Sequence, residues 1–201
     1  MTDKLRQILD AALAIADEEG LEAVTMRAVA ARVGVSPMAL YPHVGSKAAL
    51  LDAMVGRLLD SLPRPSGVDW RTGLRELAQG ARALARAHPA AFTLLLSRPS
   101  VTEDATRVVD AAYQGLLAAG VPAAEVPRLE RLVSTFVLGF AISEVNGRFS
   151  VDDPGLRVRR GAGLAGHEAV GEHLTAVDWD AEFAADLRDL ERLIESVAVH
   201  P

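Results

Sequence analysis

The stretch that decides the fold of the N-terminal part is TMRAVAARVGVSPMALYPHVGSK, residues 25–47. Thr25 is suited to cap the N-terminus of a short helix, because its hydroxyl oxygen can accept a hydrogen bond from an amide of the first turn. The helix would bury a stripe formed by Val29, Ala30 and Val33. Gly34 predicts the end of this helix, since glycine readily adopts the left-handed conformation found there.

A third helix is expected after a tight turn. Ser36 is a suitable N-cap, and Pro37 occupies the first turn, where a missing amide hydrogen costs nothing. Two short helices joined by a glycine-containing turn form a helix-turn-helix, which places its second helix in the major groove of DNA. We therefore expect residues 25–47 to bind double-stranded DNA.

The rest of the chain is predicted to be all-α as well. Half of the residues are hydrophobic, yet only 4% are aromatic, a composition typical of helices packed on helices. Apolar residues recur at helical spacing before the motif and in six stretches after it: 5–19, 47–62, 70–87, 89–97, 102–119, 123–148 and 180–197. Residues 150–178 are rich in glycine and include a basic cluster, Arg157, Arg159 and Arg160. They predict a loop with at most a short helix.

A breaker separates two units. Residues 63–67 contain two prolines and a glycine, which end the preceding helix. We place the domain boundary there. Residues 1–62 would form a helix-turn-helix DNA-binding domain that includes the start of a connecting helix, and residues 63–201 would form a helical ligand-binding and dimerisation domain.

Charge and composition limit the classes of function. The net charge is −6, and residues 1–62 carry six basic and eight acidic side chains, so the chain does not coat nucleic acid indiscriminately. No cysteine is present, which excludes disulfides and thiolate metal sites. The polar N-terminus and the lack of an apolar run of about 18 residues predict a cytoplasmic protein without membrane contact.

The motif and its flanks resemble the TetR family of transcriptional repressors, especially its tetracycline-repressor branch. The matching elements are Thr25-Met26-Arg27, Gly34-Val35, Leu40-Tyr41, His43-Val44, Lys47 and Leu50-Leu51-Asp52. The close resemblance covers about residues 5–60, and a looser one continues in the segments around 88 and 137. It implies a ligand-responsive repressor that binds a palindromic operator.

The resemblance also assigns roles on the DNA-binding surface. It implies that phosphates are contacted by Thr25, Tyr41, His43 and Lys47, that a guanine edge is reached by Arg27, and that bases are faced by Pro37, Met38 and Ala39. Pro42 departs from the family pattern, which has an aromatic or polar residue between the tyrosine and the histidine. Because it lacks an amide hydrogen, Pro42 is expected to strain the helix near Met38 and to affect the orientation of His43.

Dimerisation follows from the same resemblance. It implies that residues 123–148 and 180–197 pair with their copies in a second subunit, with an interface that includes Leu132, Gly139, Leu190 and Ile194. A two-fold dimer presents two reading helices to a palindromic site. A small molecule bound in the body would shift the population away from the state that matches the operator.

The ligand pocket is expected on the inner faces of the helices between residues 70 and 145. Such pockets are mostly apolar with a few polar groups, which suggests the set Trp70, Phe92, Leu95, Tyr113, Phe136, Phe140 and Glu144. Aromatic residues of this kind serve equally well as core or dimer contacts. For Glu144 the alternative is a solvated helix end.

The residues give little support to other classes of function. The chain has no Gly-rich phosphate loop and no nucleophile elbow, and His167 and His173 are six positions apart where a zinc-protease helix needs four, so neither an enzyme nor a cofactor is expected. Metal binding in a loop by these two histidines is a minor alternative. A helical scaffold protein without sequence-specific DNA binding is another, and the residues leave activation open beside repression.

Overall fold

The computed structural model describes residues 3–64, 69–98, 102–150, 159 and 161–199, and among them every regular element is a helix. The helices of the N-terminal part are α1 (Asp3–Glu19), η1 (Leu21–Ala23), α2 (Met26–Val33), η2 (Pro37–Leu40), α3 (Tyr41–Val44) and α4 (Lys47–Asp60). The following helices are α5 (Trp70–Ala87), α6 (Pro89–Phe92), α7 (Leu94–Ser97), α8 (Glu103–Ala118), α9 (Val126–Val145), α11 (Ala165–Val170), η3 (Gly171–His173) and α12 (Trp179–Val197). The expected all-α class is confirmed.

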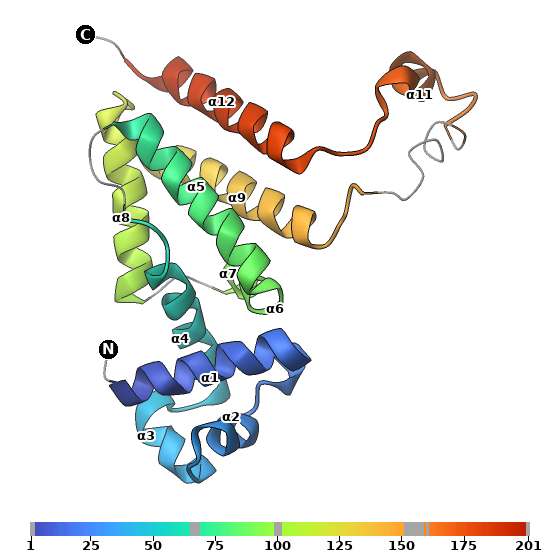
Figure 1. Cartoon of the computed structure of the whole chain (residues 1–201). Coiled ribbons are helices and arrows are strands. Elements are labelled where there is room, and N and C mark those ends of the chain that lie inside the picture. The colour runs from blue at the N-terminus through green and yellow to red at the C-terminus, as the bar shows by residue number, and fades with distance from the viewer. Residues whose placement is uncertain (1–2, 65–68, 99–101, 151–158, 160, 200–201) are drawn as a thin grey trace.

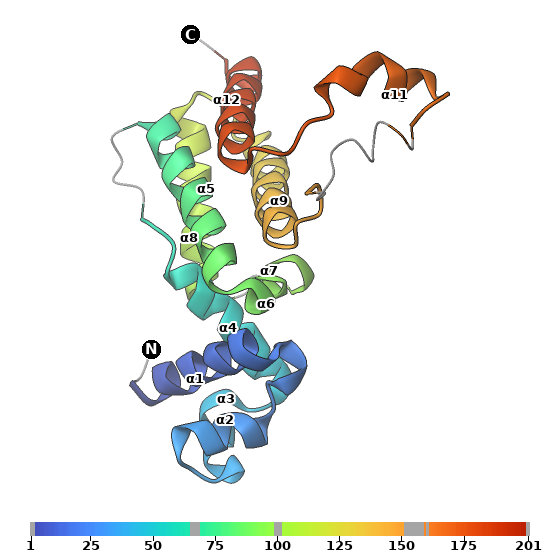
Figure 2. The same cartoon turned by 45° about the vertical axis from the view of Figure 1, so that its right-hand side comes forward.

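The helices form a small head and a larger body. Figure 1 shows α1, α2 and α3 together at one end, and α4 running from them toward the body formed by α5, α8, α9 and α12. The short helices α6 and α7 lie between the head and the upper part of the body. In both Figures 1 and 2, α11 lies apart from the body, beyond the N-terminal end of α12.

Local capping places α2 and α4 as predicted. The Thr25 hydroxyl oxygen accepts a hydrogen bond from the Ala28 amide at 3.1 Å, which starts α2. Gly34 ends α2 with φ 74°, the left-handed conformation that an L side chain rarely adopts. Ser46 caps α4 in the same way as Thr25 caps α2, since its hydroxyl oxygen accepts from the Ala49 amide at 3.1 Å.

The third helix differs from the prediction. It is a 3₁₀-helix, η2, followed directly by the four-residue α-helix α3, and Ser36 precedes it without a side-chain capping bond. The reason is Pro42, which stands in the second position of α3 and has no amide hydrogen to donate to the carbonyl of Met38. A continuous α-helical ladder through residues 37–44 is therefore interrupted.

The core of the head continues into the body through α4. Leu50, Met54 and Leu58 of α4 are fully buried, in one cluster with residues of α1 and α2 and with Phe92 and Ala141 of the body. Gly56 allows a close approach of α4 to α8, because a Cβ there would lie 2.8 Å from the Thr102 hydroxyl oxygen. The two units are thus joined by packing as well as by the chain.

In the body, most predicted helices appear with shifted ends. Residues 89–97 form two short helices, because the helix is interrupted at Thr93. The Thr93 hydroxyl donates a hydrogen bond to the Ala90 carbonyl at 2.8 Å. The long helix expected from 123 begins at Val126, with Pro127 in its first turn. Residues 150–178 hold only short helices in their described part, and residues 151–158 and 160, with Arg157 and Arg160 of the basic cluster, lie outside the described residues.

Candidate DNA-binding surface and ligand cavity

All eight side chains expected to contact DNA lie on the surface of the head. Thr25 and Arg27 belong to the start of α2, and the others belong to η2, α3 and the first residue of α4: Pro37, Met38, Ala39, Tyr41, His43 and Lys47. Each of the eight is exposed. Met38 is 74% exposed and Tyr41 44%, which is unusual for large apolar side chains and is typical of a binding surface.

The charges of the head are arranged to leave this surface basic. Two arginines away from the motif tip are held in ion pairs, Arg32 with Glu18 at 2.6 Å and Arg57 with Asp10 at 2.9 Å. Arg27 and Lys47 have no ion-pair partner among the residues that the structure describes. Their cationic groups are therefore available for phosphates or base edges, although the head carries more acidic than basic side chains.

Lys47 has a second feature that favours an anion. It is the first residue of α4, next to the capping residue Ser46, where unpaired amide hydrogens and the helix dipole attract negative charge. Tyr41 and His43 lie on α3, directly before the turn at Gly45 that leads to this helix start. The short α3 and the start of α4 therefore present their polar groups from adjacent positions of the chain.

A cavity of about 840 Å³ lies in the body. Its wall is mostly apolar and is built from helices α4, α5, α7, α8, α9 and α12. Of the expected pocket residues, Trp70 and Leu95 line it. Leu59, at the C-terminal end of α4, also lines it, so that one helix carries both Lys47 and part of the cavity wall.

The other five expected pocket residues are not among the lining residues of this cavity. Phe92 is fully buried in the core shared by head and body, and Tyr113 packs beside a small cluster around Leu116 and Leu129. Phe136 and Phe140 pack on the side of α9 that meets α12. Apolar spacing marks these side chains as inward-facing, but it does not distinguish a core from a cavity wall.

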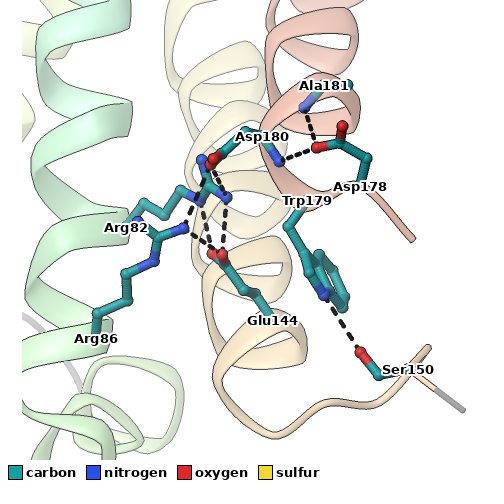
Figure 3. A network of polar contacts seen from close by, with 8 residues as sticks. All are labelled: Arg82, Arg86, Glu144, Ser150, Asp178, Trp179, Asp180 and Ala181. Atoms are coloured by element: carbon teal, nitrogen blue, oxygen red, sulfur yellow. Dashed lines mark hydrogen bonds and ion pairs between the residues drawn. The ribbon is translucent and has the colours of Figure 1, made fainter. Parts of the chain in front are cut away.

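Glu144, the fifth, belongs to a partly buried ionic network that sequence reasoning missed. Arg82 and Arg86 of α5 approach its carboxylate, and Asp180 of α12 faces both arginines (Figure 3). The Arg82 hydrogen bonds hold the pKa of Glu144 below its ordinary value, and the Glu144 carboxylate raises the pKa of Arg82. A charged residue inside an otherwise apolar helix stripe is the only sequence signal for such a network.

The N-terminus of α12 is held next to this network. The Asp178 carboxylate caps the helix by accepting from the amides of Asp180 and Ala181, at 3.1 and 3.0 Å (Figure 3). The Trp179 indole donates to the Ser150 hydroxyl oxygen at 3.3 Å and packs edge-on against Phe140, with ring centroids 5.5 Å apart. The end of α9 and the start of α12 are therefore tied together by polar and aromatic contacts.

Comparison with known proteins agrees with this architecture. Residues 8–54 match the bacterial regulatory proteins of the tetR family, and residues 74–161 match the tetracyclin repressor-like C-terminal domain. An HTH-type transcriptional regulator of Saccharopolyspora erythraea is 30% identical over 176 residues, which cover 87% of this chain and 70% of that protein. The chain belongs to the TetR family.

Two further matches of this TetR-family chain differ in how much of the other protein they cover. The HTH-type transcriptional repressor DrrR1 of Streptomyces coeruleorubidus is 32% identical over 70% of the chain, and the match spans about half of that protein, 53%. The structure of ActR from Streptomyces coelicolor in complex with actinorhodin has a TM-score of 0.82 at 22% identity, covering all of this chain and 99% of that one. At this identity the match shows a common fold.

The residues expected at the dimer interface of this TetR-family chain fall into two groups. Leu132 is 40% exposed, and an added Cβ at Gly139 would meet no atom of the chain within 4 Å, so both positions lie on an open face of α9. Leu190 and Ile194, in contrast, are buried in their own chain against α5, α8 and α9. At these two positions the apolar stripe of α12 faces the other helices of its own chain.

Two further properties concern membranes and metals. Within the described parts of the chain, none of the helices combines the length and apolarity needed to cross a membrane. No group of three or more potential metal ligands gathers among these residues. His167 and His173 lie on α11 and η3.

Proposed function

We propose that this TetR-family chain is a ligand-responsive DNA-binding regulator, and specifically a repressor, that binds a palindromic operator as a homodimer in the cytoplasm. Residues 1–62 would form the DNA-binding domain and residues 63–201 the ligand-binding and dimerisation domain. The observation that carries the proposal is the double role of α4. Its first residue, Lys47, lies on the exposed helix-turn-helix surface, and Leu59 near its other end lines the large cavity.

In this proposal the DNA contacts follow from exposure and charge. The side chains of Tyr41, His43, Lys47 and Thr25 would hold phosphates, and Arg27 would read a base edge in the major groove. The exposed Met38, with Pro37 and Ala39, would face bases and sugars, where an apolar side chain suits a thymine methyl group. Phosphate contacts set the position on the duplex, so sequence preference would depend mainly on Arg27.

A dimer would be needed to read a palindrome. The open face of α9, with Leu132 and Gly139, and the outward side of α12, with Leu193, are the surfaces that we assign to the partner subunit. Two-fold pairing of α9 and α12 with their copies would place the two heads about one helical turn of DNA apart.

Ligand response would pass through α4. A ligand that contacts Leu59 and Leu62 in the cavity would favour positions of α4 that differ from the DNA-bound position. The size of this population shift is limited by the difference in ligand affinity between the DNA-binding state and the other state. The tight contact between Gly56 and Thr102 of the segment leading into α8 would transmit such a shift along the same helix. Displacement of one head relative to the other would then lower operator affinity.

The test is selection of bound sequences from a random duplex pool by the purified protein, followed by titration of the enriched sequence at two salt concentrations. We expect an enriched palindrome whose binding weakens steeply as salt rises, because phosphate contacts release counterions. The Tyr41→Ala variant is the control and should bind the same sequence more weakly. Binding without an enriched sequence and without a salt dependence would contradict the proposal and favour the scaffold alternative.

A further inference from the structure

One carboxylate stands out on the wall of the large cavity. Glu130 lies on α9, three and seven positions before Val133 and Val137, so that all three share one face of the helix. All three residues line the cavity, together with Ser134, Thr135 and Leu138 of the same helix, so that Glu130 is the one charged residue among the lining residues of α9 that the structure describes. An acidic residue at such a position conflicts with the local pattern, and conflicts of this kind are typical of functional sites.

Glu130 has no polar partner among the described residues, although it is partly buried. Two arginines of α5 and α9 are held in other ion pairs, as Arg128 pairs with Glu125 at 2.7 Å and Arg75 pairs with Glu191 at 2.7 Å. Glu144, at the other end of the same helix, shows the opposite situation, since two arginines hold its carboxylate. The Glu130 carboxylate is therefore available to a cationic group that enters the cavity, and such a group would form a charge-assisted hydrogen bond with it.

The cavity around Glu130 carries a negative charge that is not balanced from within. Among the described residues, its charged lining side chains are Glu130 and Asp69, and no lysine or arginine lines it. The Asp69 carboxylate is already occupied, because it caps α5 by accepting from the amide and the hydroxyl of Thr72, both at 3.1 Å. Glu130 is therefore the lining carboxylate that is free to bind a cation.

A smaller neighbouring cavity has basic groups in its wall. It measures about 330 Å³, shares Leu59 and Leu62 with the large cavity, and is lined by Arg64 and Arg107. Both arginines have acidic partners, Asp60 at 3.1 Å and Glu103 at 2.5 Å. An anionic ligand would have to displace these partners, whereas a cation at Glu130 would displace none.

We propose that the effector of this cavity is an apolar molecule with a single cationic nitrogen, and that an N–H group of this cation pairs with Glu130. The inference rests on the proposed function, in which the cavity is the effector site. A volume of about 840 Å³ suits a molecule of several fused or linked rings. The apolar wall would bind the ring system, and the charge-assisted hydrogen bond to Glu130 would select for the cationic nitrogen.

Three acridines of the same ring system provide the test. 9-Aminoacridine is cationic at neutral pH, acridine is neutral and acridine-9-carboxylate is anionic. Binding to the full-length protein without DNA is followed by ligand fluorescence. We expect the cationic compound to bind roughly tenfold more tightly than neutral acridine, as for one charge-assisted pair, and the anionic compound to bind most weakly.

Two variants connect this preference to Glu130. Glu130→Gln should remove the preference for 9-aminoacridine while leaving the affinity for neutral acridine within about twofold. The matched control is Glu125→Gln, the same substitution at the start of the same helix but outside the cavity, and it should keep the wild-type order. Equal affinities in the wild type, no binding of any acridine, or a preference that survives in Glu130→Gln would overturn the proposal.

A third variant shows that the acridines occupy this cavity. Gly115 lines the cavity, and an added Cβ there would meet no atom within 4 Å, so Gly115→Leu should fold and fill part of the space. All three compounds should then lose affinity, and unchanged binding would overturn the assignment. DNA selection is measured separately, so a protein that binds an operator but shows no charge preference refutes only the ligand class. A charge preference without DNA binding refutes the regulator.

Discussion

Arg82 of α5 and Glu144 of α9 form a bidentate ion pair in which Nε lies 2.6 Å from Oε2 and Nη2 lies 2.7 Å from Oε1. Both side chains are largely buried, at 10% and 9% exposure. The guanidinium also lies over the ring of Phe183, 4.8 Å from its centroid, and Asp180 approaches it from α12 at 2.7 Å. This pair therefore connects three helices of the body at one point.

Breaking the pair should destabilise the body. Glu144→Gln leaves the Arg82 guanidinium buried with only Asp180 as an acidic partner, and we expect a loss of about 3 kcal/mol in the free energy of unfolding, the lower end for a broken buried ion pair. Urea unfolding followed by circular dichroism measures this loss. Glu103→Gln, which breaks the exposed pair with Arg107, is the control and should change stability by less than about 0.5 kcal/mol. A similar effect of both substitutions would contradict the special role of the buried pair.

The same pair should make stability depend on pH. The folded state lowers the pKa of Glu144 from its ordinary value of 4.5. The ionised Glu144 carboxylate therefore stabilises the fold fully at pH values above this ordinary pKa. This contribution is lost as the pH falls through the lower pKa of the folded state. The difference in unfolding free energy between wild type and Glu144→Gln should therefore be constant near neutral pH and shrink in acid.

Burial raises the pKa of Asp186 from 3.8, so Asp186→Asn should have the opposite sign, with a gain in stability near neutral pH that disappears in acid.

Two basic residues of the head should have different effects on DNA binding. Lys47→Ala should weaken binding to the selected palindrome and to random duplex alike, and should lower the salt slope by roughly one, because it removes a phosphate contact. Arg27→Ala should mainly reduce discrimination between the palindrome and a version changed at one base pair, by about 1 to 3 kcal/mol. Competition binding separates the two effects. If Arg27→Ala kept the full preference, another residue would read the bases.

Thr25 should act in both folding and DNA binding. Thr25→Ala removes the cap of α2 and should cost about 1 kcal/mol of stability, in addition to a loss of DNA affinity. Thr25→Ser keeps the hydroxyl group and should restore most of both properties. Thermal unfolding and DNA titration of the same two variants measure them. A serine variant as weak as the alanine variant on DNA would show that the methyl group, and not the hydroxyl, matters there.

The two leucines expected at the dimer interface should behave differently. Leu132→Glu places a charge on the open face of α9 and should convert a dimer into folded monomers in light scattering. Leu190→Ala removes a side chain from the core of its own chain and should lower the free energy of unfolding by about 2 to 5 kcal/mol. A folded dimer of Leu132→Glu would place the interface on another surface.

The helix-turn-helix could be predicted from sequence because its determinants act within a few residues. Thr25 and Ser46 each accept a hydrogen bond three positions along the chain, and Gly34 takes its left-handed conformation without help from distant segments. The expected third helix is replaced by η2 and α3 because Pro42 has no amide hydrogen, a property that is evident from the sequence. The sequence did not reveal how far the effect of Pro42 extends along this helix. In the structure the four residues Pro37–Leu40 take the tighter 3₁₀ form.

Elsewhere the sequence predicted that a face is buried but not what buries it. Ile194 and Phe92 have the apolar spacing of an interface or a pocket, yet their own chain covers them, since helix periodicity specifies a face and not its partner.

The sequence by itself therefore determined the all-helical class, the helix-turn-helix and the residues exposed on it, because capping, glycine conformation and periodicity are local. Only the tertiary structure decided that Glu144 meets two arginines while Glu130, on the same helix, faces a cavity and has no polar partner among the residues that the structure describes. Those two outcomes depend on which helices pack against each end of α9, and that is set by contacts between segments far apart in the chain.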